Sequence, residues 1–191
     1  MKRFSLAVAV LTFGSLAQAS IITVAGNLSG ANESPVTASS GTGFASFTVD
    51  TVALTITENI SFSGLTAADT AAHIHCCVAQ GGNTGVATAV PALPGFPLGV
   101  TSGTFTNQVF SLLDPTFYNP AFITANGGTV SSAEPVFLAG LLAGNTYFNI
   151  HTSTFPGGEI RAFLVPTPEP GTFLLGVLAA CGLALKRRLA R

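Results

Sequence analysis

Basic residues, tryptophan and reactive side chains are scarce in this chain of 191 residues. Trp is absent, only 8% of the residues are charged, and there are three His and three Cys. Between residues 20 and 165 the one basic residue is Arg161, against seven acidic residues, which gives this region a net charge of −6. Nucleic-acid binding needs clustered Lys and Arg, so we expect no nucleic-acid partner. The acidic surplus indicates solubility or weak cation binding.

The familiar catalytic motifs are also missing. The sequence has no Gly-x-Ser-x-Gly turn, no phosphate-binding loop and no closely spaced pair of carboxylates. A Ser-His-acid triad has no fixed order along a chain, but nothing in the sequence favours one. We therefore expect a protein that is not an enzyme. Any side-chain chemistry has to come from its few His and Cys residues.

The N-terminus has the pattern of a secretory signal. Lys2 and Arg3 are followed by an apolar run over residues 4–16 and by an Ala-Gln-Ala site that ends at Ala19. A charged start, a short apolar stretch and small residues at the cleavage point are typical of signal peptides. The sequence therefore predicts a signal peptide over residues 1–19, cut by signal peptidase so that the mature chain begins at Ser20.

The C-terminus, residues 166–191, consists of three parts. A Pro-rich segment at 166–170 is followed by an uncharged apolar stretch at 171–185 and a basic end at 186–191. Fifteen helical residues reach only about 22 Å, short of a hydrocarbon core of about 30 Å. Snorkelling of Lys186 and Arg187 can extend this reach, and the basic end predicts a cytoplasmic C-terminus. The sequence thus predicts a short transmembrane helix over residues 171–185, and a permanent tail anchor is one interpretation.

Taken in order, the three parts resemble a PEP-CTERM sorting signal. The matching positions are Pro168-Glu169-Pro170, the apolar stretch that follows, and the basic residues Arg187 and Arg188. The resemblance implies a Gram-negative bacterium in which an exosortase-type enzyme processes the tail in the inner membrane. The protein would then pass to the cell envelope, the surface or the medium, with exopolysaccharide or biofilm matrix components as candidate partners.

Between the two ends, apolar alternation predicts an all-β domain over residues 20–165. Short segments rich in Val, Ile, Phe and Thr are separated by Gly, Asn, Ser and Pro. The predicted strands are residues 21–28, 43–49, 53–62, 71–78, 100–110, 145–152 and 159–165. Frequent turn signals between them favour an Ig-like or Greek-key antiparallel β-sandwich of about seven to eight strands.

Three irregular features interrupt the predicted strands. Residues 79–99 form a long loop of a length that is usually functional or mobile. A helical turn is expected at 120–123, and a short helix at 134–142 with Pro135 in its first turn. Within the strand at 53–62, Glu58 is the one charged residue on the apolar face.

Strand alternation places the three histidines. His73 and His75 flank an apolar Ile74, so they share one face and lie roughly 6.5–7 Å apart along the strand. His151 falls on the face opposite its apolar neighbours Phe148 and Ile150. If the strands at 71–78, 145–152 and 159–165 are neighbours, one outer face gathers these residues: His73, His75, His151, Glu159 and Arg161.

Such a face has two interpretations. His-x-His with a third His from another strand can chelate Zn or Cu, with Cys77 or Glu159 as a fourth ligand. Alternatively, the histidines join Glu159 and Arg161 in a structural polar network across the strands.

Cys76 and Cys77 also leave alternatives open. Thiols of an exported protein tend to oxidise, so a disulfide between these neighbours is expected, although adjacent cysteines close only a strained ring. Metal ligation by Cys77 and pairing with another molecule are the other possibilities. Cys181 lies in the apolar tail, out of easy reach of either.

The domain resembles the CHRD domain, a module named after chordin and found in many secreted bacterial proteins. The resemblance spans roughly residues 22–165, and its motifs occur in the family's order. They are Leu-Ser-Gly-Ala-Asn-Glu-Ser-Pro-Val at 28–36, Gly64-Leu65 followed by Ala-His-Ile-His at 72–75, residues 141–152 ending in Asn-Ile-His-Thr, and Pro-Gly-Gly-Glu-Ile-Arg at 156–161. Cys76 and Ala162 stand where the family usually has Gly. The resemblance implies a secreted β-sandwich without a defined molecular role.

Two other functions have some support. The His-x-His pattern with a distant His resembles copper–zinc superoxide dismutase, but the chain offers too few ligands for that enzyme's two-metal site. Carbohydrate binding would need exposed aromatic side chains, and Phe117 and Tyr118 are the candidates. The leading expectation is a non-enzymatic exported matrix or envelope protein, with a metal-binding or redox module as the alternative.

Overall fold

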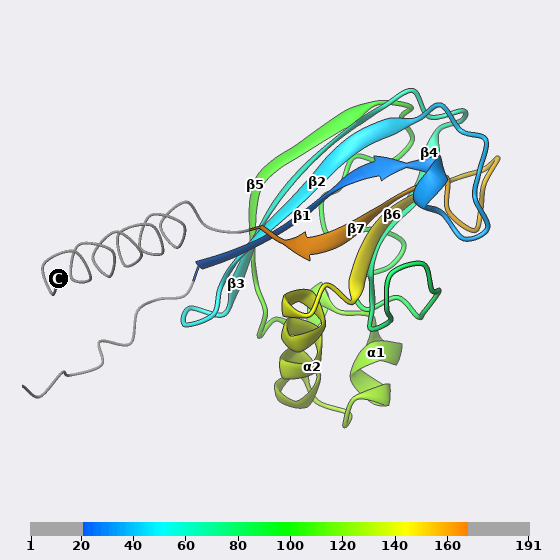
Figure 1. Cartoon of the computed structure of the whole chain (residues 1–191). Helices are drawn as coiled ribbons and strands as arrows, with labels where there is room; N and C mark the ends of the chain where they lie inside the picture. Colours follow the sequence, from blue (N-terminus) through cyan, green and yellow to red (C-terminus); the bar gives the residue numbers. More distant parts are fainter. Residues whose placement is uncertain (1–20, 168–191) are drawn as a thin grey trace, which may run out of the picture.

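A computed structural model describes residues 21–167 of the chain. These residues form seven strands, two α-helices and two 3-10 turns (Figure 1). The strands are β1 Ile21–Ser29, β2 Thr42–Asp50, β3 Thr55–Ser63, β4 Asp69–Cys76, β5 Gly103–Ser111, β6 Thr146–Thr152 and β7 Ile160–Pro166. The helices are α1 Pro120–Ala125 and α2 Val130–Leu142, and the turns are η1 Gly30–Asn32 and η2 Pro115–Phe117. Each predicted strand corresponds to one of these strands.

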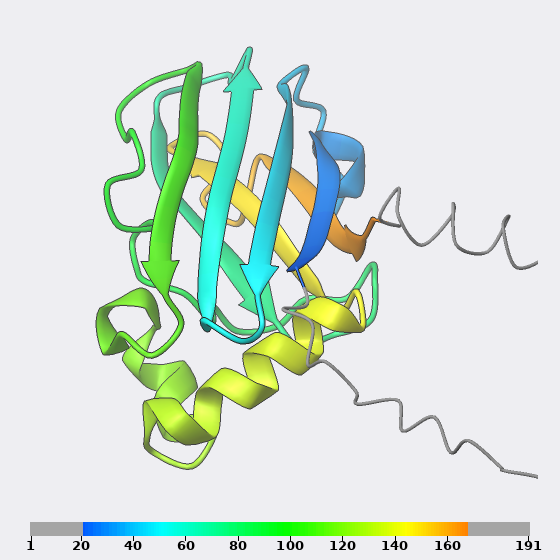
Figure 2. The same ribbon diagram turned by 90° about the vertical axis from the view of Figure 1, so that its left-hand side faces the viewer.

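The strands form one continuous antiparallel sheet in the order β4-β6-β7-β1-β2-β3-β5. The sheet curls, so that β5, β3, β2 and β1 make one layer and β7, β6 and β4 the other (Figure 2). The all-β class is confirmed. The two layers confirm a β-sandwich-like fold, but they are not the separate sheets of an Ig-like sandwich, because pairing of β7 with β1 links them into a single sheet.

The core lies between the layers and follows strand alternation. In β3, Ile56, Ile60 and Phe62 are buried, as the alternating pattern requires. In β6 and β7, Phe148 and Ile160 are fully buried on the same side. The apolar parity read from the sequence therefore identifies the core face of the sheet.

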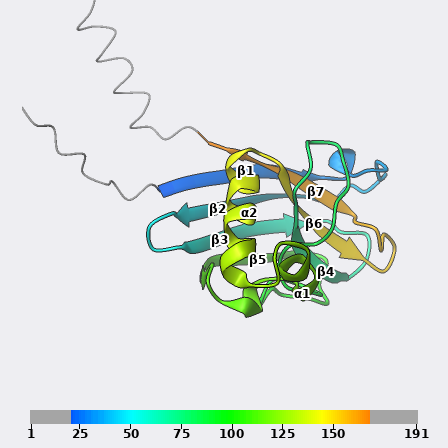
Figure 3. The ribbon, with the colours of Figure 1, turned by 90° about the horizontal axis from the view of Figure 1, so that it is seen from below.

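Helices α1 and α2 cover one end of the curled sheet (Figure 3). Thr129 caps α2 through a capping box with Ser132, so the helix begins earlier than the sequence predicts. Pro135 consequently lies inside the helix rather than in its first turn. Phe117 and Tyr118 are 1% and 2% exposed, so they cannot form the carbohydrate-binding surface for which they were candidates.

The long loop after β4 runs along the outer edge of that strand. Leu93 N donates to Ala72 O at 2.9 Å, and Ala87 N donates to Ile74 O at 2.9 Å. These bonds satisfy backbone groups that an edge strand would otherwise expose. The loop is therefore fixed to the sheet, and it covers the face of β4 that carries the histidines.

The predicted signal peptide, transmembrane helix and sorting motif lie outside the described residues. Within residues 21–167, no helix is both long and apolar enough to cross a membrane.

Candidate metal centre

Pairing of β4 with β6 brings the three histidines together. His73 lies opposite Asn149, and Ala71 lies opposite His151, so the two strands present their polar side chains side by side. The possible ligand nitrogens of His73, His75 and His151 all lie within 4.8 Å of one another. Residues 78 positions apart in the sequence thus form one compact cluster.

Each histidine is held by a backbone carbonyl. Nδ1 of His73 lies 3.0 Å from Pro91 O, Nδ1 of His75 lies 2.7 Å from Thr84 O, and Nδ1 of His151 lies 2.9 Å from Pro156 O. A carbonyl oxygen only accepts hydrogen bonds, so each Nδ1 carries the proton in these contacts. In the neutral ring, Nε2 is then left with an unprotonated lone pair.

The Nε2 atoms of His73 and His151 face one another. His73 Nε2 and His151 Nε2 are 3.0 Å apart, and the buried His75 Nε2 has no partner among the described residues. Two lone pairs at this distance repel unless a proton or a cation lies between them. Four tetrahedral ligands at about 2.0 Å from a Zn²⁺ ion are about 3.3 Å apart, close to the 3.0 Å between the Nε2 atoms of His73 and His151.

The environment disfavours a proton at this position. Burial, with smaller contributions from the neighbouring histidines, lowers the pKa of His73 to about 3. Burial likewise lowers the pKa of His75 to about 4 and lowers that of His151. At neutral pH the three rings are therefore neutral, the state in which imidazole binds metals.

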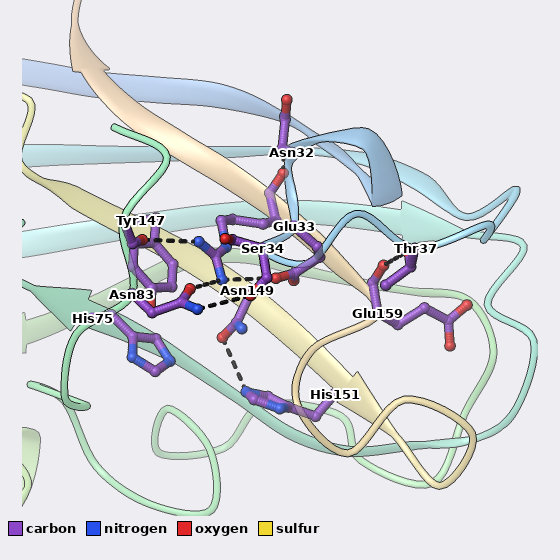
Figure 4. Close-up of polar contacts among 12 residues, drawn as sticks. Asn32, Glu33, Ser34, Thr37, His75, Asn83, Tyr147, Asn149, His151 and Glu159 are labelled. Carbon is purple, nitrogen blue, oxygen red and sulfur yellow. Dashed lines mark hydrogen bonds and ion pairs between the residues drawn. The ribbon is translucent and has the colours of Figure 1, made fainter. Parts of the chain in front are cut away.

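Asn149 adds an oxygen to the cluster. Its Oδ1 lies 3.0 Å from His151 Nε2, and the residue is 1% exposed (Figure 4). An amide oxygen in this position can serve as a fourth ligand or can hold a metal-bound water. The sequence offered one signal for this residue, because Asn149 and His151 share a face of the same strand.

A family model for the CHRD domain matches residues 24–164. The chain belongs to the CHRD domain family. Membership suggests an extracellular or secreted module, in agreement with the expected export. No curated protein and no solved structure matches the chain.

Behind the histidines, the CHRD domain has a buried ion pair. Arg161 Nη2 lies 2.8 Å from Glu33 Oε2, and both side chains are 2% exposed. The Arg161 guanidinium lies 3.9 Å above the ring of Tyr147, which stacks on His75 with ring centroids 4.4 Å apart. The roles of Glu33 and Tyr147 do not follow from the sequence, because these contacts depend on how distant segments pack.

Glycine at position 158 is required by this packing. Its φ is +125°, and a Cβ there would lie 2.6 Å from Glu33 Oε1 and 2.7 Å from Asn149 Nδ2. Any side chain would displace the acid that pairs with Arg161 or the amide beside His151. The Pro-Gly-Gly turn thus brings the backbone close to the cluster.

Glu159 does not join the histidines, contrary to one sequence expectation. Its carboxylate accepts hydrogen bonds from Ser39 Oγ at 2.6 Å, Thr152 Oγ1 at 2.6 Å and Thr66 N at 2.7 Å. Burial alone would raise the pKa of Glu159, but these bonds lower it below its ordinary value. The expected polar network is therefore divided in two, because Arg161 pairs with Glu33 and Glu159 binds a separate set of hydroxyls.

The face that carries the histidines is buried, whereas the sequence predicted that it points outward. His73 is 6% exposed and His75 is 8% exposed. The parity is as predicted, but the loop after β4 and the β6–β7 turn cover this side of the sheet, since they supply the carbonyls that bind the rings.

The two cysteines lie apart from the cluster. A disulfide joins Cys76 and Cys77. Cys77 follows the last residue of β4 and lies against Gly140 of α2, so it does not take the position of a fourth metal ligand.

Proposed function

We propose that this CHRD domain binds one transition-metal ion through the Nε2 atoms of His73, His75 and His151. One observation carries the proposal. All three Nδ1 atoms face backbone carbonyls, the Nε2 atoms of His73 and His151 are 3.0 Å apart, and the possible ligand atoms of all three rings lie within 4.8 Å of one another. Hydrogen bonds of this kind from the second ring nitrogen are what orients histidine ligands in metal proteins.

The donor set favours Zn or Cu. Neutral imidazoles suit these metals, whereas Ca²⁺ and Mg²⁺ prefer several oxygen ligands. Three nitrogens leave a fourth position, for which Asn149 Oδ1 or a water is the candidate. The site thus resembles three-histidine metal centres rather than thiolate-rich structural zinc sites.

We assign the metal a binding role rather than catalysis. The described residues contain a single cluster of potential ligands, whereas the dismutase considered from the sequence uses two metals. A dismutase assay on the copper-loaded protein tests this part of the proposal, and activity above that of free copper would contradict it.

Metal content of the purified full-length protein tests the site. After loading with Zn or Cu and removal of loose ions, we expect about one metal per chain by mass spectrometry. His73→Ala and His151→Ala should each lower the affinity at least tenfold, since each removes a ligand. The matched control is Glu159→Gln, which changes a nearby buried polar residue outside the cluster and should retain the metal. Absence of bound metal in the folded wild-type protein would overturn the proposal.

We further propose that the protein is exported and sorted through its C-terminal tail. The support is the order of the motif Pro168-Glu169-Pro170, the apolar stretch and the basic end, together with the signal-peptide pattern. Replacing the three motif residues with Ala should retain the protein in the inner-membrane fraction, whereas Thr172→Ala should leave its distribution unchanged. Unchanged localisation of the motif variant would count against sorting.

A further inference from the structure

The Cys76–Cys77 disulfide lies on the wall of a pocket of about 590 Å³. The pocket is formed by the end of β4, residues 84–86, and the helices α1 and α2. Cys76 is 5% exposed and belongs to the core, whereas Cys77 is exposed. Both residues line the pocket, and Cys77 is the more exposed of the two, so a small molecule in the pocket meets Cys77 more readily.

This disulfide contributes little as a structural crosslink. In the chain-entropy account, a disulfide stabilises a fold by closing a loop in the unfolded chain, and the effect increases with loop length. Cys76 and Cys77 are adjacent, so their bond restricts almost none of the unfolded chain. Its presence requires an explanation other than stability.

Helix α2 is shaped around the two sulfurs. A Cβ at Gly140 would lie 2.5 Å from the sulfur of Cys76 and 2.5 Å from that of Cys77. Gly is unfavourable inside a helix, by about 1 kcal/mol relative to Ala. The helix thus has its glycine where the sulfur pair needs space, which is a second observation that the pair is built into the fold.

We propose that Cys76–Cys77 is a thiol–disulfide exchange site for small uncharged thiols that enter this pocket. None of the pocket-lining residues is charged, and the polar ones are Thr84, Asn119 and Asn126. This lining favours a neutral hydroxyl-bearing thiol over a multiply charged one. Exposed disulfides are in general the labile ones, which agrees with the exposure of Cys77.

The exchange is a balanced two-electron reaction. The thiolate of the small molecule attacks the sulfur of Cys77, the bond between the two cysteines breaks, and the sulfur of Cys76 leaves and takes up a proton. A second small thiolate then attacks the ligand sulfur of the mixed disulfide. This step releases a small-molecule disulfide and leaves both cysteines as thiols, so two small thiols are oxidised and the protein disulfide is reduced.

The test uses the full-length protein without denaturant and 2-mercaptoethanol as the probe. We expect the disulfide to open in the native protein and to form a mixed disulfide with the probe. Acid quenching followed by peptide mass mapping detects this mixed disulfide and distinguishes an adduct at Cys76 or Cys77 from one at Cys181. The Cys76→Ser variant, treated with the symmetrical disulfide of the probe, should hold a stable adduct at Cys77. In the Cys77→Ser variant, the less exposed Cys76 should react at least tenfold more slowly.

Three results would overturn the proposal. These are two free thiols in protein isolated from an oxidising compartment, a disulfide that opens only in denaturant, and equal adduct rates in the two single-cysteine variants. The two cysteines are not part of the histidine cluster, so the same measurements on the wild-type protein, with and without added Zn, separate the two sites. Exchange should persist even if the wild-type protein binds no metal.

Discussion

Glu58 is the one acidic residue on the apolar, buried face of β3. It occupies an inward position of β3, opposite Phe47 and Gln108, and is fully buried. Neither of its carboxyl oxygens has a hydrogen-bond partner in the part of the chain that the structure describes. Burial raises the pKa of Glu58 to about 8, so the side chain is protonated at neutral pH.

Glu58 should make the domain less stable as pH rises. In the unfolded chain the carboxyl ionises near its ordinary pKa of 4.5, and in the folded chain only near 8. Between these values the unfolded state binds fewer protons, so unfolding becomes more favourable by up to about 1.4 kcal/mol per pH unit. Glu58→Gln removes the ionisation, so its stability relative to wild type should be lowest below pH 4.5 and increase up to pH 8.

Urea unfolding of both proteins from pH 4 to pH 9 measures this difference. The remaining carboxyls, including Glu33 with its raised pKa, are present in both proteins and cancel in the comparison. A difference that stays constant across the range would show that Glu58 does not ionise in this manner.

Residue-level prediction succeeded where strand parity is sufficient. His73 and His75 share a face because alternation requires it, and β6 pairs with β4 as the histidine hypothesis assumed. Strand alternation also places Asn149 on the face of His151, but an Asn side chain does not indicate a metal site as a histidine does. Glu33 was not predictable, because its contact with Arg161 links residues far apart in the sequence.

At the scale of elements, the strands were predictable because apolar and polar residues alternate along a half-buried strand. The loop after β4 has no such period, so its bonding along β4 could not be foreseen. That loop, together with the β6–β7 turn, is the reason why the histidine face is buried. Pro135 was placed in the first turn of a helix, but the capping residue Thr129 moves the start of α2 towards the N-terminus.

Gly140→Ala tests the fit between α2 and the sulfur pair. Helix propensity alone would stabilise the protein by about 1 kcal/mol, whereas overpacking against the two sulfurs costs about 1–3 kcal/mol. We expect net destabilisation in urea unfolding, because the new Cβ would meet both sulfurs. Gly157→Ala is the control, since a Cβ there has no heavy atom within 4 Å.

The same substitution in a Cys76→Ser, Cys77→Ser background completes a double-mutant cycle. Gly140→Ala should cost less there, because two hydroxyls lack the bulk and the bond of the disulfide. An equal cost in both backgrounds would show that the helix is shaped by something other than the sulfurs.

At the scale of the whole molecule, the candidate metal centre connects segments that the sheet alone does not hold. The three histidines lie on β4 and β6, while their Nδ1 partners are Thr84 and Pro91 in the long loop and Pro156 in the β6–β7 turn. A metal that fixes the rings would also fix the loops through these bonds. The centre should therefore stabilise the fold beyond its immediate surroundings.

Metal binding should raise the thermal midpoint of the domain. A ligand that binds only the folded state at 100 times its Kd adds about 2.7 kcal/mol, which for a domain of this size is about 5–10 °C. Calorimetry with Zn or Cu and with a chelator measures the shift, and His151→Ala should reduce it by about half or more, since it weakens metal binding at least tenfold. Hydrogen exchange should slow at the same time in residues 84–91, because their carbonyls hold two of the rings. A shift of the midpoint in His151→Ala equal to that of the wild-type protein would place the metal elsewhere.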